Sequence, residues 1–439
     1  MKQLMIKGGR VIDPARDYDQ VADVLIKDGV VEKIAPGQKS PSGAEVIDAE
    51  GLIVTPGLID IHVHLRDPGQ EYKEDILSGT RAASAGGFTA VAAMANTEPV
   101  GDDPSMINYV LNKASGAAAR VYPLGALTKG LEGKEMAELG RMKLAGAAGF
   151  SDDGKPVMDG MMMRNALHYA SGIGAVVIVH EEDSNLAAGG MMHEGTVSSL
   201  LGLRGIPAAA EEAMISRDLM ILKITGGRLH IAHVSTAGSV ELLRRAKAEG
   251  LNVTAEVTPH HLLLTDRLVK NSGYNTNTKV NPPLRTENDR QALWAGLLEG
   301  TIDAVASDHA PHHTDDKDVE YDFAPCGIAG LESTLPLLLD EVASGRIKGF
   351  TLPLLLEKLS SGPARVLGLP GGSFEDGKAG DVTIIDPERE FIIEPDNWYS
   401  RSRNTPFAGK RLKGAPVYTI VGGEITMKEG VVTERAVQG

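Results

Sequence analysis

The feature that most constrains the fold is a regular alternation of strand-length apolar runs with helix-like stretches. Eight apolar runs are predicted as strands, at 58–65, 88–96, 120–127, 147–153, 175–182, 229–235, 252–258 and 302–309. Between most of them lie stretches with helical spacing of apolar residues, such as 74–87, 160–174, 208–224 and 238–250, and glycine typically closes them. This alternation predicts an α/β fold, a (β/α)8 TIM-like barrel.

An open, doubly wound sheet is the competing architecture. Its dinucleotide-binding form carries a G-x-G-x-x-G turn after the first strand, and the sequence has no such turn there. The barrel is therefore favoured.

The two ends of the chain differ from the middle, because short alternating runs broken by Gly and Asp indicate antiparallel strands. We expect one small β-sandwich module formed by both chain termini. The predicted division is 1–55 and 371–439 for the two parts of that module, and 56–370 for the barrel.

Composition limits the class of protein. Hydrophobic residues make up 42% and charged residues 23%, as in globular proteins. The net charge of −15 argues against nucleic acid or an anionic membrane as the main partner, although a small anionic substrate stays open. A single cysteine, Cys326, suits a reducing compartment. With no signal peptide at the start and no apolar run near the ~18 residues of a membrane span, we expect a soluble cytoplasmic protein.

Chargeable side chains follow the predicted strands at the point where each strand ends. In a barrel of this kind the carboxyl ends of the strands form the mouth that holds the active site. The residues at these ends include four histidines and several carboxylates: His62, His64, Asn96, Asp152, Asp153, His180, His233 and Asp308.

Strand parity supports convergence of these side chains. His180 shares a face with Ile178, His233 shares one with Ile231, and Asp308 shares one with Ala306. We expect the apolar faces to fill the barrel and the last residue of each to emerge at its mouth. By the same parity, His230 points the other way.

Nitrogen and oxygen donors without a nearby cysteine favour Zn, Mn, Fe or Co. Each signal alone has a simpler interpretation: a lone His180 is typically a core histidine, and Asp-Asp-Gly is an ordinary turn. Their joint placement favours a metal centre, and six donors suit two metals sharing a bridging carboxylate and hydroxide. His260 and His261 could orient ligands. Four other histidines lack a place at a strand end and are interpreted as structural or solvated: His168, His193, His230 and His313.

Several motifs resemble the amidohydrolase superfamily and, within it, the longer bacterial (class I) dihydroorotases. The similarity runs over nearly the whole chain and includes "DIHVHLRDPGQEYKED", "MANTEP", "GFSDDG", "VNPPLR", "SDHAPH" and "GIAGLES". H-x-H alone marks only the superfamily, whereas "HLRDPG" together with "SDHAPH" and "NPPLR" is far more specific.

The resemblance implies two zinc ions per subunit. The bridge between them is often a carboxylated lysine in the superfamily, but here the fourth strand ends in Asp152 and Asp153, and class I members use the second aspartate. Lys155, which shares the parity of Asp153, stays open as the rival bridge. The implied metal ligands are His62, His64, Asp153, His180, His233 and Asp308.

The resemblance also implies substrate contacts, with Asp308 as the catalytic acid and base. A family phenylalanine before glycine appears here as Cys326, which leaves ring packing at that position in doubt. The implied substrate-binding residues are His64, Arg66, Asn96, Asn281, His312, Cys326 and Gly327.

The implied reaction is the reversible hydrolysis of (S)-dihydroorotate to N-carbamoyl-L-aspartate by a metal-bridged hydroxide, in de novo pyrimidine biosynthesis. The segment 311–327 is interpreted as a mobile loop over the site. Two alternatives remain: another cyclic amidohydrolase (hydantoinase, dihydropyrimidinase or allantoinase), or a non-catalytic partner of aspartate transcarbamoylase. The family implies a homodimer, and association of an active enzyme with the transcarbamoylase stays open.

Overall fold

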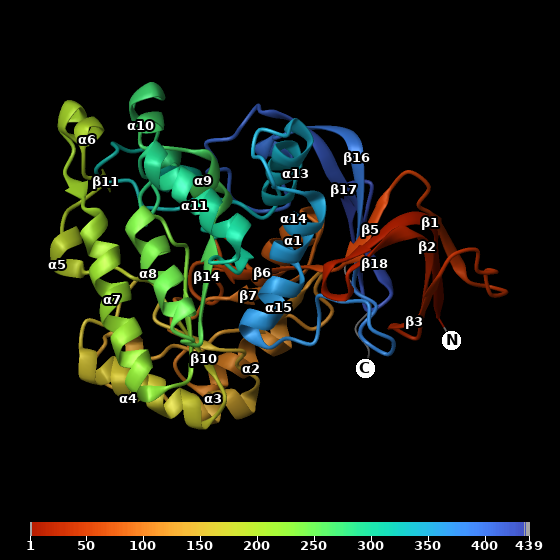
Figure 1. The fold of residues 1–439 in the computed structure, drawn as a ribbon, viewed down its shortest axis with the longest axis horizontal. Helices are drawn as coiled ribbons and strands as arrows, with labels where there is room; N and C mark the ends of the chain where they lie inside the picture. Colours follow the sequence, from red (N-terminus) through yellow and green to blue (C-terminus); the bar gives the residue numbers. More distant parts are fainter. Residues whose placement is uncertain (1, 434, 436–439) are drawn as a thin grey trace.

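The computed structural model describes residues 2–433 and 435 and has two parts (Figure 1). One part is a barrel of parallel strands surrounded by helices. The other is a β-rich sheet built from the first and last segments of the chain, which lie side by side in Figure 1.

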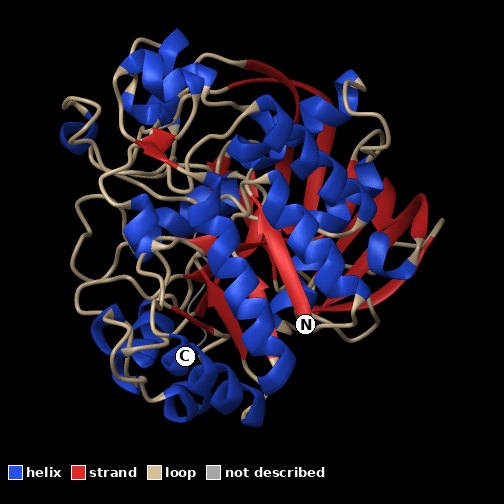
Figure 2. Cartoon of the chain, turned by 60° about the vertical axis from the view of Figure 1, so that its left-hand side comes forward, coloured by secondary structure: helices blue, strands red, loops and turns tan. Residues whose placement is uncertain are grey.

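Eight strands form the barrel in chain order: β6 (Leu58–Val63), β7 (Phe88–Ala93), β8 (Arg120–Pro123), β9 (Phe150–Ser151), β10 (Val176–Val179), β13 (Arg228–Ile231), β14 (Val253–Val257) and β15 (Ala304–Val305). Helices cover them as an outer layer (Figure 2): α1 (Ile76–Ala85), α2 (Pro104–Lys113), α3 (Leu139–Ala145), α4 (Gly160–Gly172), α7 (Ala208–Thr225), α8 (Ala237–Ala248), α11 (Glu287–Glu299), α13 (Thr334–Ser344), α14 (Leu352–Leu359) and α15 (Ser361–Leu367).

The ring of strands closes through two short bridges. Hydrogen-bonded pairing runs β6-β7-β8 in one sheet and β9-β10-β13-β14-β15 in another. Gly125 and Phe150 form a parallel bridge between the end of β8 and β9, and Val63 and His309 form one between β6 and the segment after β15. The predicted (β/α)8 barrel is therefore confirmed.

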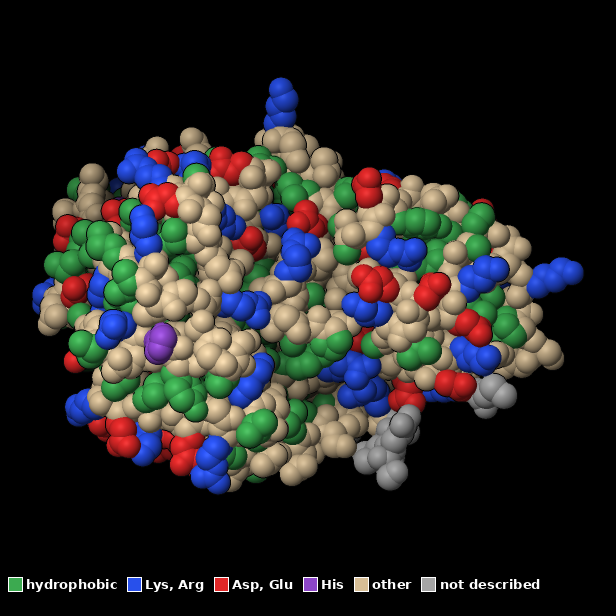
Figure 3. Space-filling view, turned by 60° about the horizontal axis from the view of Figure 1, so that its bottom comes forward, with side chains coloured by type: hydrophobic (Ala, Val, Ile, Leu, Met, Phe, Trp, Pro, Cys, Tyr) green, Lys and Arg blue, Asp and Glu red, His purple; other side chains and the backbone are tan. Residues whose placement is uncertain are grey.

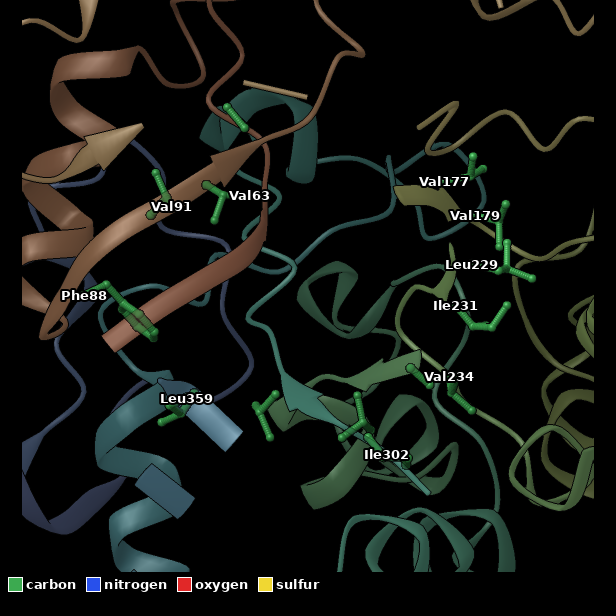
Figure 4. Packing of buried hydrophobic residues seen from close by; sticks show 14 of the residues in the cluster. Val63, Phe88, Val91, Val177, Val179, Leu229, Ile231, Val234, Ile302 and Leu359 are labelled. Atoms are coloured by element: carbon green, nitrogen blue, oxygen red, sulfur yellow. The ribbon is translucent and has the colours of Figure 1, made fainter. Parts of the chain in front are cut away.

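Alternation along the strands separates two apolar layers. One set of side chains fills the barrel interior, including Ile59 and Ile61 of β6, Val176 and Ile178 of β10, and Ala304 next to β14. The other set packs the strands against the helices, and Figure 4 shows several of its members, among them Phe88, Val91, Val177, Val179, Leu229 and Ile231. The strands are thus buried on both faces, as expected for parallel barrels.

Short elements lie in the connections, mostly at the mouth of the barrel. They are α5 (Ser184–Ala187), β11 (Met192–His193), α6 (Thr196–Leu201), β12 (Gly205–Ile206), α9 (Pro259–Leu263), α10 (Arg267–Asn271), α12 (Thr314–Lys317) and the 3₁₀ turns η1 (Pro14–Arg16), η2 (Lys129–Leu131), η3 (Thr276–Thr278) and η4 (Pro395–Asn397).

The terminal sheet combines both ends of the chain, as expected. Its strands are β1 (Gln3–Asp13), β2 (Tyr18–Lys27), β3 (Val30–Ala35), β4 (Glu45–Asp48), β5 (Ile53–Pro56), β16 (Val382–Ile392), β17 (Arg411–Val421), β18 (Glu424–Lys428) and β19 (Val431–Val432). The long β1 pairs with β4 through Leu4–Lys7 and with β5 through Arg10–Val11. A separate apolar cluster, with residues from both ends of the chain, forms the core of this part.

The last barrel strand is shorter than its sequence predicts. The predicted strand spans 302–309, but β15 covers only Ala304–Val305. The chain leaves the strand because the backbone N–H of Ser307 donates to the carboxylate of Asp60 instead of a neighbouring strand, and Asp308 then adopts a positive φ of 46°. This turn directs the chain toward the mouth.

Within the described residues, helices that are both long and apolar enough to cross a membrane are absent. On the face seen in Figure 3, acidic and basic side chains are interspersed, with apolar side chains between them.

Candidate metal centre

The first two histidines enter the mouth from β6 because that strand carries a bulge. Its register with β7 shifts between Asp60 and Val63. Ile61 belongs to the barrel interior, while Val63 packs in the outer layer. A bulge re-aims side chains at a strand end, and here it lets His62 face the interior directly after Ile61.

Asp153 lies between these histidines and a second pair. Its Oδ1 is 3.5 Å from Nε2 of His62, and its Oδ2 is 3.5 Å from Nε2 of His64. Its Oδ1 is also 3.4 Å from Nε2 of His233 and 3.8 Å from Nδ1 of His180. Two groups of donor atoms therefore share one carboxylate: His62, His64 and Asp153, and Asp153, His180 and His233.

The route by which His233 reaches the site differs from the prediction. Strand parity was expected to align it with an interior Ile231, but Ile231 packs in the outer layer and Ala232 faces the interior. His233 turns into the mouth because its backbone adopts a positive φ of 32°, just after β13 ends. His230, interpreted as structural or solvated, is fully buried on the interior side.

Asp308 lies beside the first histidine pair. Its Oδ1 is 3.2 Å from Nε2 of His64 and 3.5 Å from Nε2 of His62. It shares parity with Ala304 and Ala306 of the barrel interior, as predicted. A carboxylate in this position can accept a proton from a group held between it and the histidines.

Burial and charge oppose each other at these residues. Burial alone would lower the pKa of His62, but the carboxylates of Asp153, Glu256 and Asp308 together raise it well above its usual value. Burial would raise the pKa of Asp153 and of Asp308, yet His62 and its neighbours keep both pKa values low. Burial lowers the pKa of His180 to about 4. Ionised carboxylates beside a neutral histidine attract a cation.

The donor set fits divalent metal ions. Nε2 of His62 and Oδ1 of Asp153 are buried and have no hydrogen-bond partner among the described residues, although both point at other donor atoms. Buried polar atoms are rarely left unpaired without a reason such as an ion. Imidazole nitrogens and carboxylates at this spacing are ligands that Zn²⁺ and similar ions accept.

The neighbours of Asp153 do not enter this cluster. Asp152 accepts hydrogen bonds from the backbone N–H of Leu127 at 2.7 Å and of Thr128 at 3.0 Å, and from the Thr128 hydroxyl. Lys155, the rival bridge, is exposed. Of these three side chains, Asp153 is the one that lies within both groups of donor atoms.

Two further predicted residues flank the first histidine pair. Oδ1 of Asn96 lies 2.9 Å from Nδ1 of His64, so Asn96 orients that ring. Arg66 is in the left-handed region at a φ of 60°, and its Nε donates to the carbonyl of Pro311 at 3.3 Å. Its terminal nitrogens are thereby left for another acceptor.

The remaining predicted residues are Asn281, His312, Cys326 and Gly327. Nδ2 of Asn281 is 3.5 Å from Nε2 of His180, and its Oδ1 is buried without a partner among the described residues. His312 points Nε2 at the carbonyl of Cys326 at 2.8 Å, and the Cys326 residue itself is exposed. Gly327 is required there, because a Cβ at its φ of 148° would lie 2.6 Å from the carbonyl oxygen of Ala310.

Sequence reasoning missed one residue that touches the centre. Oε1 of Glu256 lies 2.6 Å from Nδ1 of His62, and Glu256 is 1% exposed. Its signal was a charged residue inside the apolar run 252–258, because a charge is seldom buried without a partner. His260 and His261, which could orient ligands, are buried with their rings tilted at 49° to each other, and His261 contacts Thr258 and the Pro282 carbonyl instead.

Comparison with known proteins identifies the family. A family model described as "Dihydro-orotase-like" matches residues 51–239. A protein named dihydroorotase from Pelotomaculum thermopropionicum is 53% identical over 430 residues, which cover 98% of this chain and 100% of that protein. Another so named, from Geobacter sp. (strain M21), is 52% identical over 97% of this chain and 100% of its own length.

Solved structures agree on the fold at lower identity. An L-hydantoinase (dihydropyrimidinase) from Arthrobacter aurescens has a TM-score of 0.88 at 28% identity, covering 99% of this chain and 98% of its own. A D-hydantoinase has a TM-score of 0.86 at 26% identity, covering 99% and 97%. Because the relatives that are about half identical over their full length are named dihydroorotase, the chain belongs to the dihydroorotase family.

Proposed function

We propose that the chain catalyses the reversible hydrolysis of (S)-dihydroorotate to N-carbamoyl-L-aspartate, a step of de novo pyrimidine synthesis, with two zinc ions per subunit. The observation that carries this proposal is the position of Asp153, 3.5 Å from His62 and His64 and 3.4 Å from His233. Relatives named dihydroorotase that match nearly the whole chain support the choice of reaction.

Six residues would hold the ions, with Asp153 shared between them: His62, His64, Asp153, His180, His233 and Asp308. When bound, zinc at such a site supplies Lewis acidity, which brings the pKa of water from ~15.7 toward 7 and polarises a carbonyl. The four histidines would be neutral ligands, so they would add no negative charge that weakens this Lewis acidity.

Asp308 moves the proton. In the ring-opening direction its Oδ1, 3.2 Å from Nε2 of His64, accepts the proton of the attacking water. It then delivers that proton to the ring nitrogen as the amide C–N bond breaks. In the closing direction the same oxygen takes a proton from the carbamoyl nitrogen and returns it to the departing oxygen, so that water leaves.

Recognition of the substrate carboxylate falls to the side chains around the mouth. Arg66 keeps its terminal nitrogens for a bidentate contact, since only its Nε is bonded, to Pro311, among the described residues. Oδ1 of Asn281 and Nδ1 of His312 are buried and unpaired there, and they suit the polar edge of the ring. The backbone at Cys326 and Gly327 completes the proposed substrate-binding site.

The cellular setting and the assembly are further parts of the proposal. We place the enzyme in the cytoplasm, since a single cysteine suits a reducing compartment. A homodimer is expected from the family resemblance, and partnership with aspartate transcarbamoylase stays open.

The test is a parallel assay of the purified protein on dihydroorotate, hydantoin and allantoin, together with elemental analysis for metals. We expect bound zinc, with ring opening of dihydroorotate far above that of the other two, and ring closure of N-carbamoyl-L-aspartate. Preferred turnover of hydantoin or allantoin would replace the proposal with that cyclic amidohydrolase. Absence of both metal and turnover would indicate a non-catalytic partner subunit.

A further inference from the structure

A buried polar chain inside the barrel ends at His62 of the metal centre. Oε1 of Glu256 lies 2.6 Å from Nδ1 of His62, and Oε2 lies 3.1 Å from Nε2 of His230. Nδ1 of His230 lies 2.8 Å from Oγ1 of Thr254, which is its direct neighbour across β13 and β14. The chain therefore runs Thr254, His230, Glu256, His62.

This arrangement needs a physical reason, because a carboxylate in a barrel interior is costly to bury. Glu256 is 1% exposed, and both His62 and His230 are 0% exposed. Glu256 forms ion pairs with these two histidines. Apolar side chains fill the neighbouring interior positions, including Ala232 and Ala304. The fold thus retains a charge where an apolar residue would pack.

The hydrogen bond to Glu256 decides which nitrogen of His62 carries the proton. A carboxylate only accepts, so Nδ1 must be the protonated nitrogen of a neutral His62 ring. Nε2 then presents its lone pair toward Asp153 and Asp308, each 3.5 Å away, and it has no hydrogen-bond partner among the described residues. The opposite tautomer would place a proton on Nε2 and bond it to Asp153, which would exclude a cation.

We propose that Glu256 is a positioning residue for metal binding, which holds His62 in the tautomer that can ligate, while His230 and Thr254 hold Glu256 in place. This inference rests on the proposed metal centre. A histidine ligand whose other N–H is fixed by a carboxylate is a more basic and better oriented ligand. The negative charge of Glu256 also adds to those of Asp153 and Asp308 opposite the ions.

The experiment measures the dissociation constant of Zn²⁺ alone, by chelator competition on metal-free protein, in the unchanged protein and in Glu256→Gln. Loss of such a carboxylate typically weakens metal affinity about 10–100-fold, and we expect that loss here for the site of His62 and His64. Glu256→Asp, which keeps the charge on a shorter side chain, should recover part of the affinity. Nitrogen NMR of the Zn²⁺-loaded protein should show His62 with a protonated Nδ1 and a metal-bound Nε2, and a mixture of this and the opposite arrangement in Glu256→Gln.

Glu332→Gln is the matched control, because Glu332 is also a buried acidic side chain but accepts from the backbone N–H of Tyr399 and Ser400. It should leave the Zn²⁺ dissociation constant unchanged. If Glu256→Gln does not fold, His230→Leu removes the second partner of Glu256 and should weaken Zn²⁺ several-fold. If a folded Glu256→Gln, or His230→Leu in its place, keeps both its Zn²⁺ affinity and its His62 tautomer, this inference alone is overturned. If the unchanged protein fails to bind Zn²⁺, the proposed metal centre is overturned as well.

Discussion

At the residue scale, Asp152, Asp153 and Lys155 are close in sequence but differ in what they contact. Asp153 reaches the histidines of both pairs, while the oxygens of Asp152 accept from Leu127 and Thr128. Lys155 is exposed. A carboxylate can bridge two cations without the CO₂ that a lysine would need. Asp153 can therefore serve as the bridge directly from the strand end.

We therefore predict different outcomes for three alanine variants. Asp153→Ala should lose at least one bound zinc and nearly all turnover of dihydroorotate, because both groups of donors share that carboxylate. Asp152→Ala should be milder, with an effect on stability, and Lys155→Ala should keep both metals. Metal analysis and turnover of the purified variants provide the check. Loss of activity in Lys155→Ala would move the bridge to Lys155. Recovery of activity on adding bicarbonate, after CO₂ has been stripped from the unchanged protein, would do the same.

A second prediction concerns Asp308. Asp308→Asn keeps the shape of the side chain but cannot take a proton, so turnover should fall by about 10²–10⁴-fold, the usual contribution of general acid–base catalysis. Steady-state kinetics with metal content measured on the same sample is the appropriate assay. A variant that kept more than about a tenth of the original turnover would contradict the assignment, since proton transfer alone contributes more.

The sequence predicts which residues meet at the mouth better than it predicts how they arrive there. His180 and Asp308 follow strand parity, but His233 depends on a backbone turn with φ of 32°, which alternation does not encode. His62 depends on a bulge. Glu256 was missed because its partners, His62 and His230, come from other strands.

At the element scale, the segment 399–404 ties the C-terminal part to the mouth of the barrel. Nδ2 of Asn404 donates to the carbonyls of Ala310 and Gly327, and its Oδ1 accepts from the backbone N–H of His312. The hydroxyl of Ser400 donates to buried Glu74. The segment 311–327, interpreted from the sequence as a loop over the site, is thus anchored at both ends by a segment distant in sequence.

From this anchoring we predict that Asn404→Ala raises the KM for dihydroorotate. Loss of the contacts at both ends of the loop displaces His312, and a net cost of about 1.4 kcal/mol corresponds to a tenfold change. Zinc content should stay unchanged, because Asn404 contacts none of the proposed ligands in the described structure. Initial-rate kinetics would reveal the effect, and an unchanged KM would show that the loop holds its position without Asn404.

Long periodic elements were predicted more closely than the short strands. The expected helices 160–174 and 208–224 appear as α4 and α7 with nearly the same limits. The expected strands 147–153 and 302–309 shrink to two residues each, β9 and β15. The sequence pattern predicts which residues are buried, not which of them pair with a neighbouring strand. The ends of these runs are buried by contacts such as the hydrogen bond from the backbone N–H of Ser307 to the carboxylate of Asp60.

At the scale of the whole molecule, the terminal sheet has an apolar cluster of its own, while its residues Ile12, Ile53 and Ile385 pack in the cluster of the barrel. A buried polar junction also joins the barrel to the C-terminal part of the chain. Glu332, after the last barrel strand, accepts from the backbone N–H of Tyr399 and Ser400. Glu74 and His309 meet in the same region at 3.3 Å. We keep the division into 1–55, 56–370 and 371–439 as a proposal, with this junction between the parts.

The junction makes stability depend on pH. Burial raises the pKa of Glu332 from 4.5 to about 8. Between these values the folded chain binds more protons than the unfolded chain, so the stabilisation is complete below pH 4.5 and is lost as pH rises toward 8. We predict that the free energy of unfolding of Glu332→Gln falls less steeply from pH 5 to pH 8 than that of the unchanged protein. Each pKa unit corresponds to about 1.4 kcal/mol, so denaturant titrations can resolve the slopes, and parallel slopes would contradict the prediction.

The central claim, that two cations shared by Asp153 perform ring hydrolysis of dihydroorotate, is tested most directly by returning Zn²⁺ in steps to metal-free protein and following turnover of dihydroorotate at each step. The claim predicts that turnover is negligible without metal and reaches its plateau at two zinc ions per subunit. A plateau at one zinc ion, or a fully loaded protein that does not open the dihydroorotate ring, would contradict it.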